Sequence, residues 1–358
     1  MSENPPINHQ RSPIDQKHKR NFMRKFKEKW QTDPLFSIMI ALVIMVILQT
    51  LVLGFDYNSF GEWFQAWTNN WINILRNNAS IGIVALGMTF VIMTGGIDLA
   101  VGSTLVMTGA FAMMLLDTGT KGLLAIVGIT GLPAYMLTIV LVLLFGYLLG
   151  SLIGVSITKG NVPPFIATLG AMLILRSVTQ HFMQGYNPAV PSEFLQIASF
   201  KMGSYMIMPI VYWAIIAYIL YYVSKRTTFG RQIIAVGSNE RAARLSGVNV
   251  EKVKLRVYSL MGLLVAIAAI IQVSRIGSMD FSNAGRGMEM DAIAAAVVGG
   301  TSMMGGRGFI LGTVYGMLII AVMNNLLNLF GVPPFLREAF KGVIVIAAVL
   351  LQRKERVS

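Results

Sequence analysis

Long runs of apolar residues, separated by short polar stretches, are the feature that most constrains this chain. The first run, residues 35–55, contains no charged side chain. About 20 apolar residues are enough for a helix to cross a membrane, and lipid offers no water to satisfy backbone outside a helix or a closed barrel. The sequence is 55% hydrophobic and 13% charged, whereas soluble domains have about one quarter charged residues. We therefore predict an all-α, polytopic integral membrane protein.

About ten transmembrane helices are expected in one membrane domain, residues 35–351, with some helices short or broken. The segment 56–73, with Trp63, Trp67 and Trp71 at four-residue spacing, is predicted as a separate interfacial helix because tryptophan favours the headgroup region. The segment 291–304 is short and glycine-rich, as is typical of a half-helix. The predicted spans are residues 35–55, 74–94, 99–116, 134–156, 163–182, 205–224, 257–274, 291–304, 309–330 and 337–351.

Basic residues are concentrated in three polar segments. The tail 1–34 has a net charge of +4, the loop 225–256 of +6 and the tail 352–358 of +2, together +12 of the formal +13. Cytoplasmic segments of membrane proteins carry such an excess of Lys and Arg, which also attracts anionic membrane lipid. We predict that both tails and the loop are cytoplasmic, and that the charge does not serve nucleic-acid binding.

The loop 225–256 contains the signals of a short capped helix. Asn239, between Ser238 and Glu240, can open the helix because a short polar side chain accepts a free backbone N–H. Gly247 can close it, and residues 241–245 lie between. A charged helix of this kind cannot be buried in lipid, so we expect it to face water or a soluble partner.

Two stretches share the pattern G-G-x5-G-[S/T], and each joins a small-residue apolar run to the next span. Paired glycine-interrupted segments in two halves of a transporter point to the substrate route, whereas close helix packing through glycine is the other interpretation. The predicted topology gives both copies the same orientation. Their glycines are Gly95, Gly96, Gly102, Gly305, Gly306 and Gly312.

The composition argues against chemistry performed by the chain itself. It has no cysteine and three scattered histidines, so neither a disulfide framework nor a metal site of zinc type is expected. No G-x-x-x-x-G-K-[S/T] segment occurs, so the sequence offers no P-loop for ATP. We expect a protein that is not an enzyme and that holds no cofactor or metal of its own.

Several stretches resemble the permease subunits of bacterial ABC importers for ribose and related simple sugars. The resemblance runs in the same order from about residue 75 to residue 351, and only the first 30 or so residues look longer and more basic than the family's usual start. It is carried by ALGMTFVIMTGGIDLAVGS (85–103), NVPPFIATLGAMLILRSV (161–178), TTFGRQIIAVGSNERAARLSGVNV (227–250), RIGSMDFSNAGRGMEMDAIAAAVVGGTSMMGGRGFILGTVYGMLI (275–319) and MNNLLNLFGV (323–332).

The resemblance implies a homodimer of permeases in the bacterial cytoplasmic (inner) membrane. A cytosolic ATP-binding subunit, as two copies or two fused halves, would bind the ATP, and a periplasmic sugar-binding protein would deliver the substrate. It also implies a coupling helix that docks in a groove on the ATPase. Arg241 stands where the family pattern has its first alanine, but the small residues that follow still allow close approach. The coupling residues are then Asn239, Glu240, Arg241, Ala242, Ala243 and Gly247.

An uncharged sugar should meet amide and hydroxyl groups and aromatic faces along its route. Hydrogen bonding between helices is the alternative role for each polar residue in a span. The candidates for the route are Asn77, Asn78, Asp98, Asn161, Phe165, Asn324, Asn325 and Asn328.

Charged residues near the spans leave a second class of transporter open. Asp98 and Asp291 could carry protons in an ion-coupled secondary transporter, since intramembrane acids often mark ion pathways. Asp98 lies at a glycine turn, however, and Asp291 begins an apolar run, so capping a helix or compensating its dipole explains both more simply. Arg176 either pairs with an acid or lines the route.

The sequence therefore favours the membrane-spanning permease of an ATP-driven importer, which would translocate a pentose, a hexose or a related polyol by alternating access. The alternatives are an ion-coupled secondary transporter and an ABC permease for a nucleoside or a branched-chain amino acid.

Overall fold

The computed structural model describes residues 34–119, 121–333, 336–343 and 346. The predicted tails 1–34 and 352–358 thus lie outside the described residues, apart from residue 34. The described chain is helical except for its loops and one small hairpin, β1 (Lys201–Met202) paired with β2 (Tyr205–Met206). This confirms the predicted all-α class.

Seven of the described helices are long and apolar enough to cross a membrane. They are α2 (Pro34–Leu53), α3 (Phe60–Met93), α6 (Gly131–Thr158), α7 (Pro164–Met183), α9 (Met208–Arg226), α12 (Val250–Ile276) and α14 (Ile310–Leu329). Two further predicted spans are the shorter helices α4 (Val101–Leu116) and α13 (Met288–Val298). Of the tenth predicted span, 337–351, residues 337–343 are described and helical, and most of the remainder lies outside the described residues.

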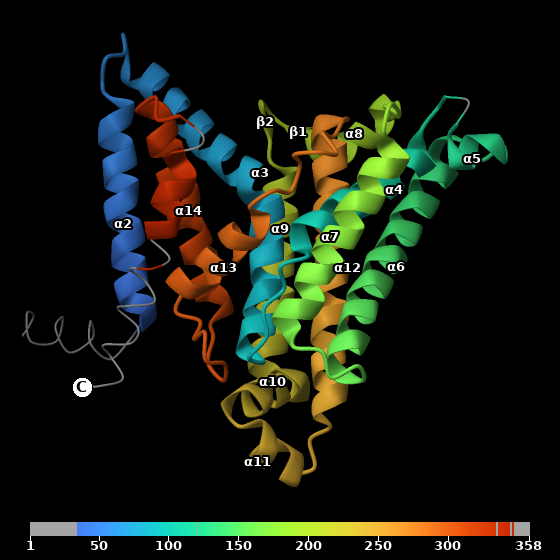
Figure 1. Cartoon of the computed structure of the whole chain (residues 1–358). Helices are drawn as coiled ribbons and strands as arrows, with labels where there is room; N and C mark the ends of the chain where they lie inside the picture. Colours follow the sequence, from blue (N-terminus) through green and yellow to red (C-terminus); the bar gives the residue numbers. More distant parts are fainter. Residues whose placement is uncertain (1–33, 120, 334–335, 344–345, 347–358) are drawn as a thin grey trace, which may run out of the picture.

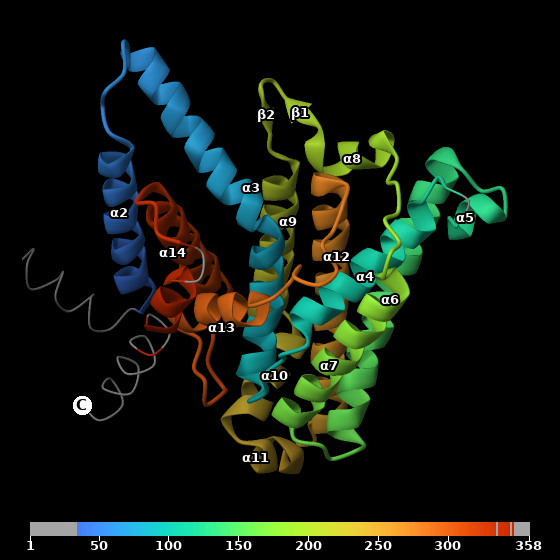
Figure 2. The same cartoon turned by 45° about the horizontal axis from the view of Figure 1, so that its top comes forward.

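The helices run between two ends of a wedge-shaped bundle, broad at one end and narrow at the other (Figure 1). One end, which we call the α11 end, carries α10 (Thr228–Ser238) and α11 (Glu240–Leu245). The opposite, α8 end carries α5 (Leu123–Ile126), α8 (Ser192–Ser199) and the hairpin. Helices α2 and α14 lie side by side at one edge in both views (Figure 2).

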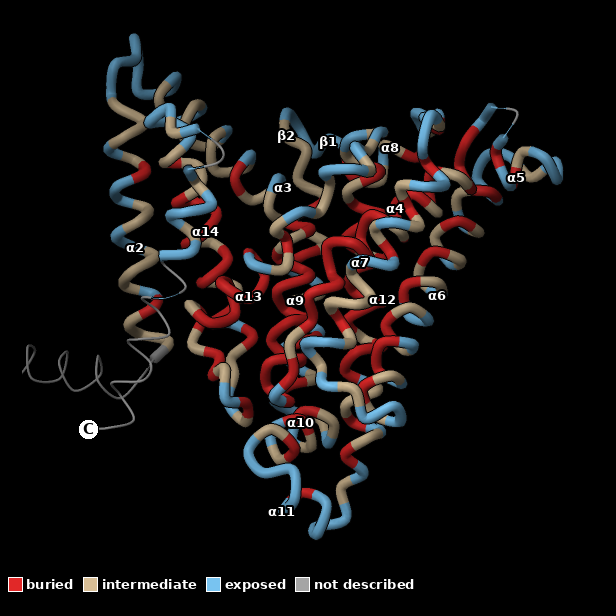
Figure 3. Tube along the Cα trace, viewed as in Figure 1, coloured by how far each residue is buried: buried red, intermediate tan, exposed pale blue. Residues whose placement is uncertain are grey.

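The buried centre of the bundle is formed by α12, α13, α4 and the half of α3 nearer the α11 end (Figure 3). The apolar surfaces of α2 and α7 are largely exposed, as expected where lipid or another chain replaces the protein core. Close packing at the centre depends on glycine: a Cβ added at Gly262 of α12 would lie 2.1 Å from the carbonyl oxygen of Gly146 on α6. Such close approach is a common mode of helix packing in membranes.

The predicted boundary between an interfacial helix at 56–73 and a span at 74–94 is wrong. α3 is one helix of 34 residues, capped by the Ser59 side chain, which accepts the Glu62 N–H. No proline interrupts it, and some of its polar residues find partners along the helix: Arg76 donates to Asn73 at 3.0 Å. Polarity alone therefore did not end the helix.

The loop 225–256 is far more helical than the one short helix that the sequence predicted. α9 extends to Arg226, α10 follows it, and α12 begins at Val250, seven residues before the predicted span. The Thr227 side chain accepts the Gly230 N–H, and Asn249 accepts the Lys252 N–H at 2.8 Å. These caps begin helices in a stretch that is too polar and too short in its apolar runs to be predicted as a membrane span.

Candidate functional site

α11 is a short helix fixed at both ends, as the sequence predicted. The Asn239 Oδ1 accepts a backbone N–H of the first turn at 2.9 Å. At the other end Gly247 has φ +83°, and its N–H bonds to the carbonyl of Arg244 at 3.1 Å. The next N–H, of Val248, bonds to the carbonyl of Ala243 at 3.0 Å. This pair of bonds is a Schellman motif, which favours glycine in the left-handed position.

Ion pairs hold α11 against the first turns of α12. Glu240 contacts Lys254 at 2.6 Å and Arg244 at 3.3 Å, and Arg244 also pairs with Glu251. The hydrogen bond from Lys254 lowers the pKa of Glu240, so this carboxylate is ionised at neutral pH. Exposed pairs each add little stability, but together they set the direction in which α11 projects.

The structure differs from the prediction at Ala243, which is 5% exposed and packs into the hydrophobic core. Its side chain faces the bundle and is not available to contact a partner. The outward face is formed by Arg241, Ala242 and Leu245, and Leu245 is 83% exposed. Leu245 is not among the predicted coupling residues, although a large apolar residue in a charged, water-facing helix is itself a signal of a docking surface.

The two glycine turns lie side by side at the α11 end. The N–H of Gly306 donates to the carbonyl of Met93, at the end of α3, at 2.9 Å. Further along the same helix pair, the hydroxyls of Thr89 and Thr313 are 2.6 Å apart. Each turn is followed by a helix that runs away from the α11 end (Figure 1), so the two copies have the same orientation, as predicted.

The third glycine of each copy serves close packing. A Cβ added at Gly102 would lie 2.0 Å from the carbonyl oxygen of Gly285, and one added at Gly312 would lie 2.0 Å from that of Gly299. Both pairs bring backbone against backbone, so the packing interpretation of the repeat holds at these positions.

The predicted route residues do not converge on one cavity. Asn161 is exposed and has φ 52°, a conformation that asparagine tolerates better than most residues, so its turn explains its identity. Phe165, at the start of α7, is 55% exposed. Asp98 is buried and accepts the Ala100 N–H at 2.8 Å just before α4, which fits a local structural role.

Other predicted route residues join helices or bond within one. Asn77 of α3 accepts a hydrogen bond from Arg275 of α12 at 2.6 Å. Asn78 donates to the carbonyl of Ile74 in its own helix at 2.8 Å. The structure thus favours the alternative role, hydrogen bonding between helices, for Asn77, whereas Asn78 bonds only within α3.

The three asparagines of α14 differ from one another. Asn325 accepts from Gln49 of α2 at 2.9 Å, and Asn328 accepts from Arg337 at 2.8 Å. The Oδ1 of Asn324 is buried and has no hydrogen-bond partner among the described residues. Asn324 is therefore the member of this group that is still free to bind a ligand.

Asn324 belongs to a set of unpaired polar atoms on α2, α3 and α14. Within the described chain, Gln49 Oε1, Asn70 Nδ2 and Trp71 Nε1 are likewise buried without a hydrogen-bond partner. α2 and α3 approach each other in this region, where Trp67 Nε1 donates to a threonine of α2 at 3.1 Å. Buried polar atoms are rarely left unpaired, and these four include both donors and acceptors, so each is a candidate to meet a polar ligand. The sequence analysis missed Gln49, Asn70 and Trp71.

The intramembrane charges are bound to protein groups. Asp291 is 7% exposed, lies in the first turn of α13 after the N-cap Gly287, and pairs with Lys341 at 2.8 Å. It therefore sits where it compensates the helix dipole, as predicted, although it is not the cap. Arg176 donates to the carbonyl of Ala284 at 2.6 Å.

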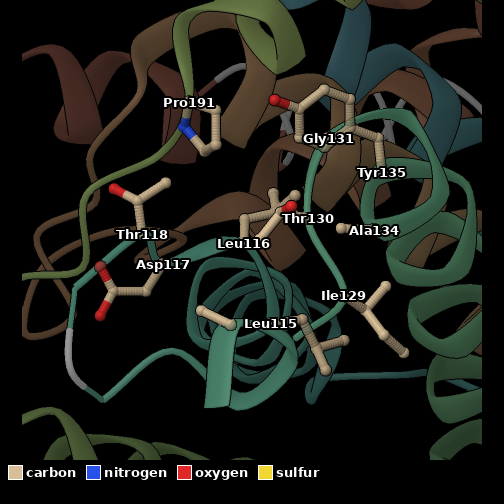
Figure 4. A pocket seen from close by; sticks show the side chains of 11 residues that line it. Leu115, Leu116, Asp117, Thr118, Ile129, Thr130, Gly131, Ala134, Tyr135 and Pro191 are labelled. Atoms are coloured by element: carbon tan, nitrogen blue, oxygen red, sulfur yellow. The ribbon is translucent and has the colours of Figure 1, made fainter. Parts of the chain in front are cut away.

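A cavity of about 100 Å³ lies at the α8 end and contains none of the predicted route residues (Figure 4). Its lining is mostly apolar. The Asp117 carboxylate at its edge accepts from the Tyr186 hydroxyl at 2.7 Å and from the Ala189 N–H at 2.9 Å. These bonds tie the end of α4 to the segment before α8, so Asp117 is structural.

Comparison with known proteins identifies the family of the chain. A family model described as the permease component of a branched-chain amino acid transport system matches residues 70–349. The chain therefore belongs to this family of ABC transporter permease components.

Similar curated proteins include several sugar permeases. The chain is 39% identical to the ribose import permease of Escherichia coli (strain K12), over 93% of this chain and 97% of that protein. It is 41% identical to the ribose import permease of Bacillus subtilis (strain 168), over 80% and 85%. It is 31% identical to the fructose import permease of Rhizobium meliloti, over 94% and 90%. No solved structure matches. The chain is thus a multi-pass membrane permease of the simple-sugar type.

Proposed function

We propose that this chain is the membrane-spanning subunit of an ATP-driven importer that moves a pentose, a hexose or a related polyol by alternating access. A separate cytosolic ATP-binding subunit would bind the ATP and dock on α11, which places the α11 end and both termini in the cytoplasm. Two copies of the permease would form the path, and a periplasmic sugar-binding protein would deliver the substrate at the α8 end.

The observation that carries this proposal is α11 itself. A capped six-residue helix, oriented by Glu240 and Arg244, presents Leu245 to water at 83% exposure. An isolated helix this short is not stable in water, so its caps and ion pairs preserve a defined shape. A defined, partly apolar projection on a membrane protein is what a soluble partner needs for docking.

The sugar substrate is supported by the relatives' names and by the unpaired buried polar atoms of α2, α3 and α14. Sugar hydroxyls both donate and accept, so they could pair with the amides of Gln49 and Asn324 while the ring lies against Trp71. The alternative of an ion-coupled carrier has less support, because Asp98 and Asp291 are bound to protein groups.

Affinity purification of the tagged chain from its native membranes in mild detergent tests the proposal. We expect an ATP-binding subunit to co-purify, and the complex in proteoliposomes, with the binding protein, to take up sugar only when ATP is supplied. Recovery of the chain alone, with uptake driven by an ion gradient, would overturn the proposal. Competition with nucleosides or branched-chain amino acids, but not sugars, would assign another substrate.

Replacing Asn324 with leucine tests the sugar contact. The change removes an unpaired buried oxygen, so the stability of the permease should be unchanged or higher. Loss of one hydrogen bond to the sugar, about 0.5–1.5 kcal/mol, should raise the KM of uptake by roughly 2- to 10-fold. Asn328→Leu, which alters an exposed residue bonded to Arg337, is the control. An unchanged KM in Asn324→Leu would remove Asn324 from the route.

A further inference from the structure

α10 ends against both glycine turns at once. In Figures 1 and 2 its last turn lies beside the tip of α3 and the loop between α13 and α14. A Cβ added at Gly237, in that last turn, would lie 1.7 Å from the carbonyl oxygen of Met93 and 2.5 Å from the amide nitrogen of Gly306. Gly237 therefore fits where no other residue would, over the hydrogen bond that joins the two turns.

The glycines of the second turn, Gly305 and Gly306, are also closely packed at this junction. A Cβ added at Gly305 would lie 2.8 Å from the Gly237 carbonyl oxygen and 3.2 Å from the Gly95 amide nitrogen. One added at Gly306 would lie 2.9 Å from the Cα of Ser238. Apart from the Ser238 Oγ, which would lie 2.5 Å from a Cβ at Gly306, these contacts are with backbone atoms, and backbone cannot yield by changing rotamer.

The junction is connected to α11 without any intervening loop. Asn239 is both the C-cap of α10, donating its N–H to Ala235 at 3.1 Å, and the N-cap of α11. Any displacement of α11 therefore acts directly on the last turn of α10, where Gly237 lies.

On its other side the junction continues into the buried centre. Thr89 of α3 and Thr313 of α14 are both fully buried, with their hydroxyls 2.6 Å apart. Tyr258 of α12 donates to the carbonyl of Ile97, just after the first turn, at 3.3 Å. The two turns are thus held to each other and to the central helix.

We propose that Gly237 and the two Gly-Gly turns form one rigid joint that carries displacement of α11 to α3 and α14 together. Gly237 acts here as a positioning residue, because its missing side chain lets α10 press on both turns. This inference rests on the proposed docking of an ATP-binding subunit at α11. It adds that displacement of α11 is passed to α3 and α14, and that the two Gly-Gly turns move as a unit and not against each other.

The first test is Gly237→Ala, compared with Gly170→Ala. Gly170 lies in α7, where an added Cβ meets nothing within 4 Å. We expect Gly237→Ala to reach the membrane and retain the ATP-binding subunit and its ATP hydrolysis, while ATP-driven uptake falls at least tenfold. Gly170→Ala should transport normally. Normal uptake in Gly237→Ala would overturn the joint. Failure of uptake in the unaltered protein and in Gly170→Ala would instead contradict the proposed function.

The second test does not depend on whether Gly237→Ala folds. The natural chain has no cysteine, so Thr89→Cys with Thr313→Cys introduces one defined pair. The two side chains already touch, and oxidation should link α3 to α14. If the turns move as a unit, the oxidised and reduced forms of the double variant should take up sugar at equal rates. Uptake that is blocked by oxidation and restored by a reductant would show that the turns separate, and would overturn the proposal.

Discussion

Replacing Leu245 with aspartate is expected to reduce ATP-driven uptake at least tenfold and to release the ATP-binding subunit during purification. Leu245 is the large apolar side chain at the outer surface of α11, 83% exposed. Burying a leucine in a docking groove contributes about 1.5–3 kcal/mol, and a carboxylate in the same groove would have to be desolvated without a partner. The measurement is the amount of ATP-binding subunit recovered with the tagged permease, together with sugar uptake.

The matched control is Leu245→Met, which keeps an apolar side chain of similar size and should retain most of the uptake. Because the residue makes no contribution to the core, both variants should reach the membrane in normal amounts. Normal co-purification and uptake in Leu245→Asp would show that α11 does not dock through this face.

Replacing Lys341 with methionine should strongly destabilise the permease. Lys341 is the ion-pair partner of Asp291 at 2.8 Å, and Asp291 is 7% exposed. Removing one member of a buried pair leaves an uncompensated charge, which typically costs about 3–5 kcal/mol. We expect a lower unfolding temperature in detergent, with α13 losing its position first.

A double variant separates the ion pair from a proton-carrying role. In Lys341→Met with Asp291→Asn neither charge remains, so most of the lost stability should return, and ATP-driven uptake with it. No recovery of the unfolding temperature would show that the pair is not what holds α13. Recovery of stability with uptake still absent would instead favour a direct role of Asp291 in transport, as in an ion-coupled carrier.

Much of the fold could be predicted from the sequence, because a chain that crosses lipid must satisfy its backbone hydrogen bonds within apolar helices. Long, mainly apolar runs predicted α2, α6, α7 and α14 to within a few residues. The boundary errors fall where polar residues occur inside helices, as in the joined α3 and the early start of α12. There the partners that make polar residues tolerable leave no mark on hydropathy: Asn73 for Arg76 within α3, and Glu240 of α11 for Lys254 of α12.

The candidate site likewise has features that neighbouring residues predict and features that depend on tertiary packing. The caps of α11 are local signals, so Asn239 and Gly247 could be predicted from neighbouring residues. The inward turn of Ala243 and the outward turn of Leu245 depend on how α11 sits on the bundle, which spacing over six residues does not define. The route could not be predicted, because hydrogen bonding between distant helices decides which asparagine remains free for a ligand. Asn325 is hydrogen-bonded to Gln49, whereas the Oδ1 of Asn324 has no partner among the described residues.

The shortness of α13 has a consequence for how the chain is made. Its 11 residues extend roughly 16 Å at about 1.5 Å per residue, against a hydrocarbon core of about 30 Å. Its first turn also contains two acids, Glu289 and Asp291. Lys341, the partner of Asp291, is synthesised 50 residues after it. A nascent segment of this kind cannot enter lipid by itself as it leaves the ribosome.

The order of insertion should therefore differ from the order of synthesis, with α13 entering only after the segment that holds Lys341. A cysteine at Ala292, fully buried in the folded chain, reports this step. We expect a membrane-impermeant thiol reagent to label it in a chain truncated at residue 335 but not in the full-length chain. Equal protection in both would mean that α13 needs only the helices before it and α14, and that biogenesis follows the sequence.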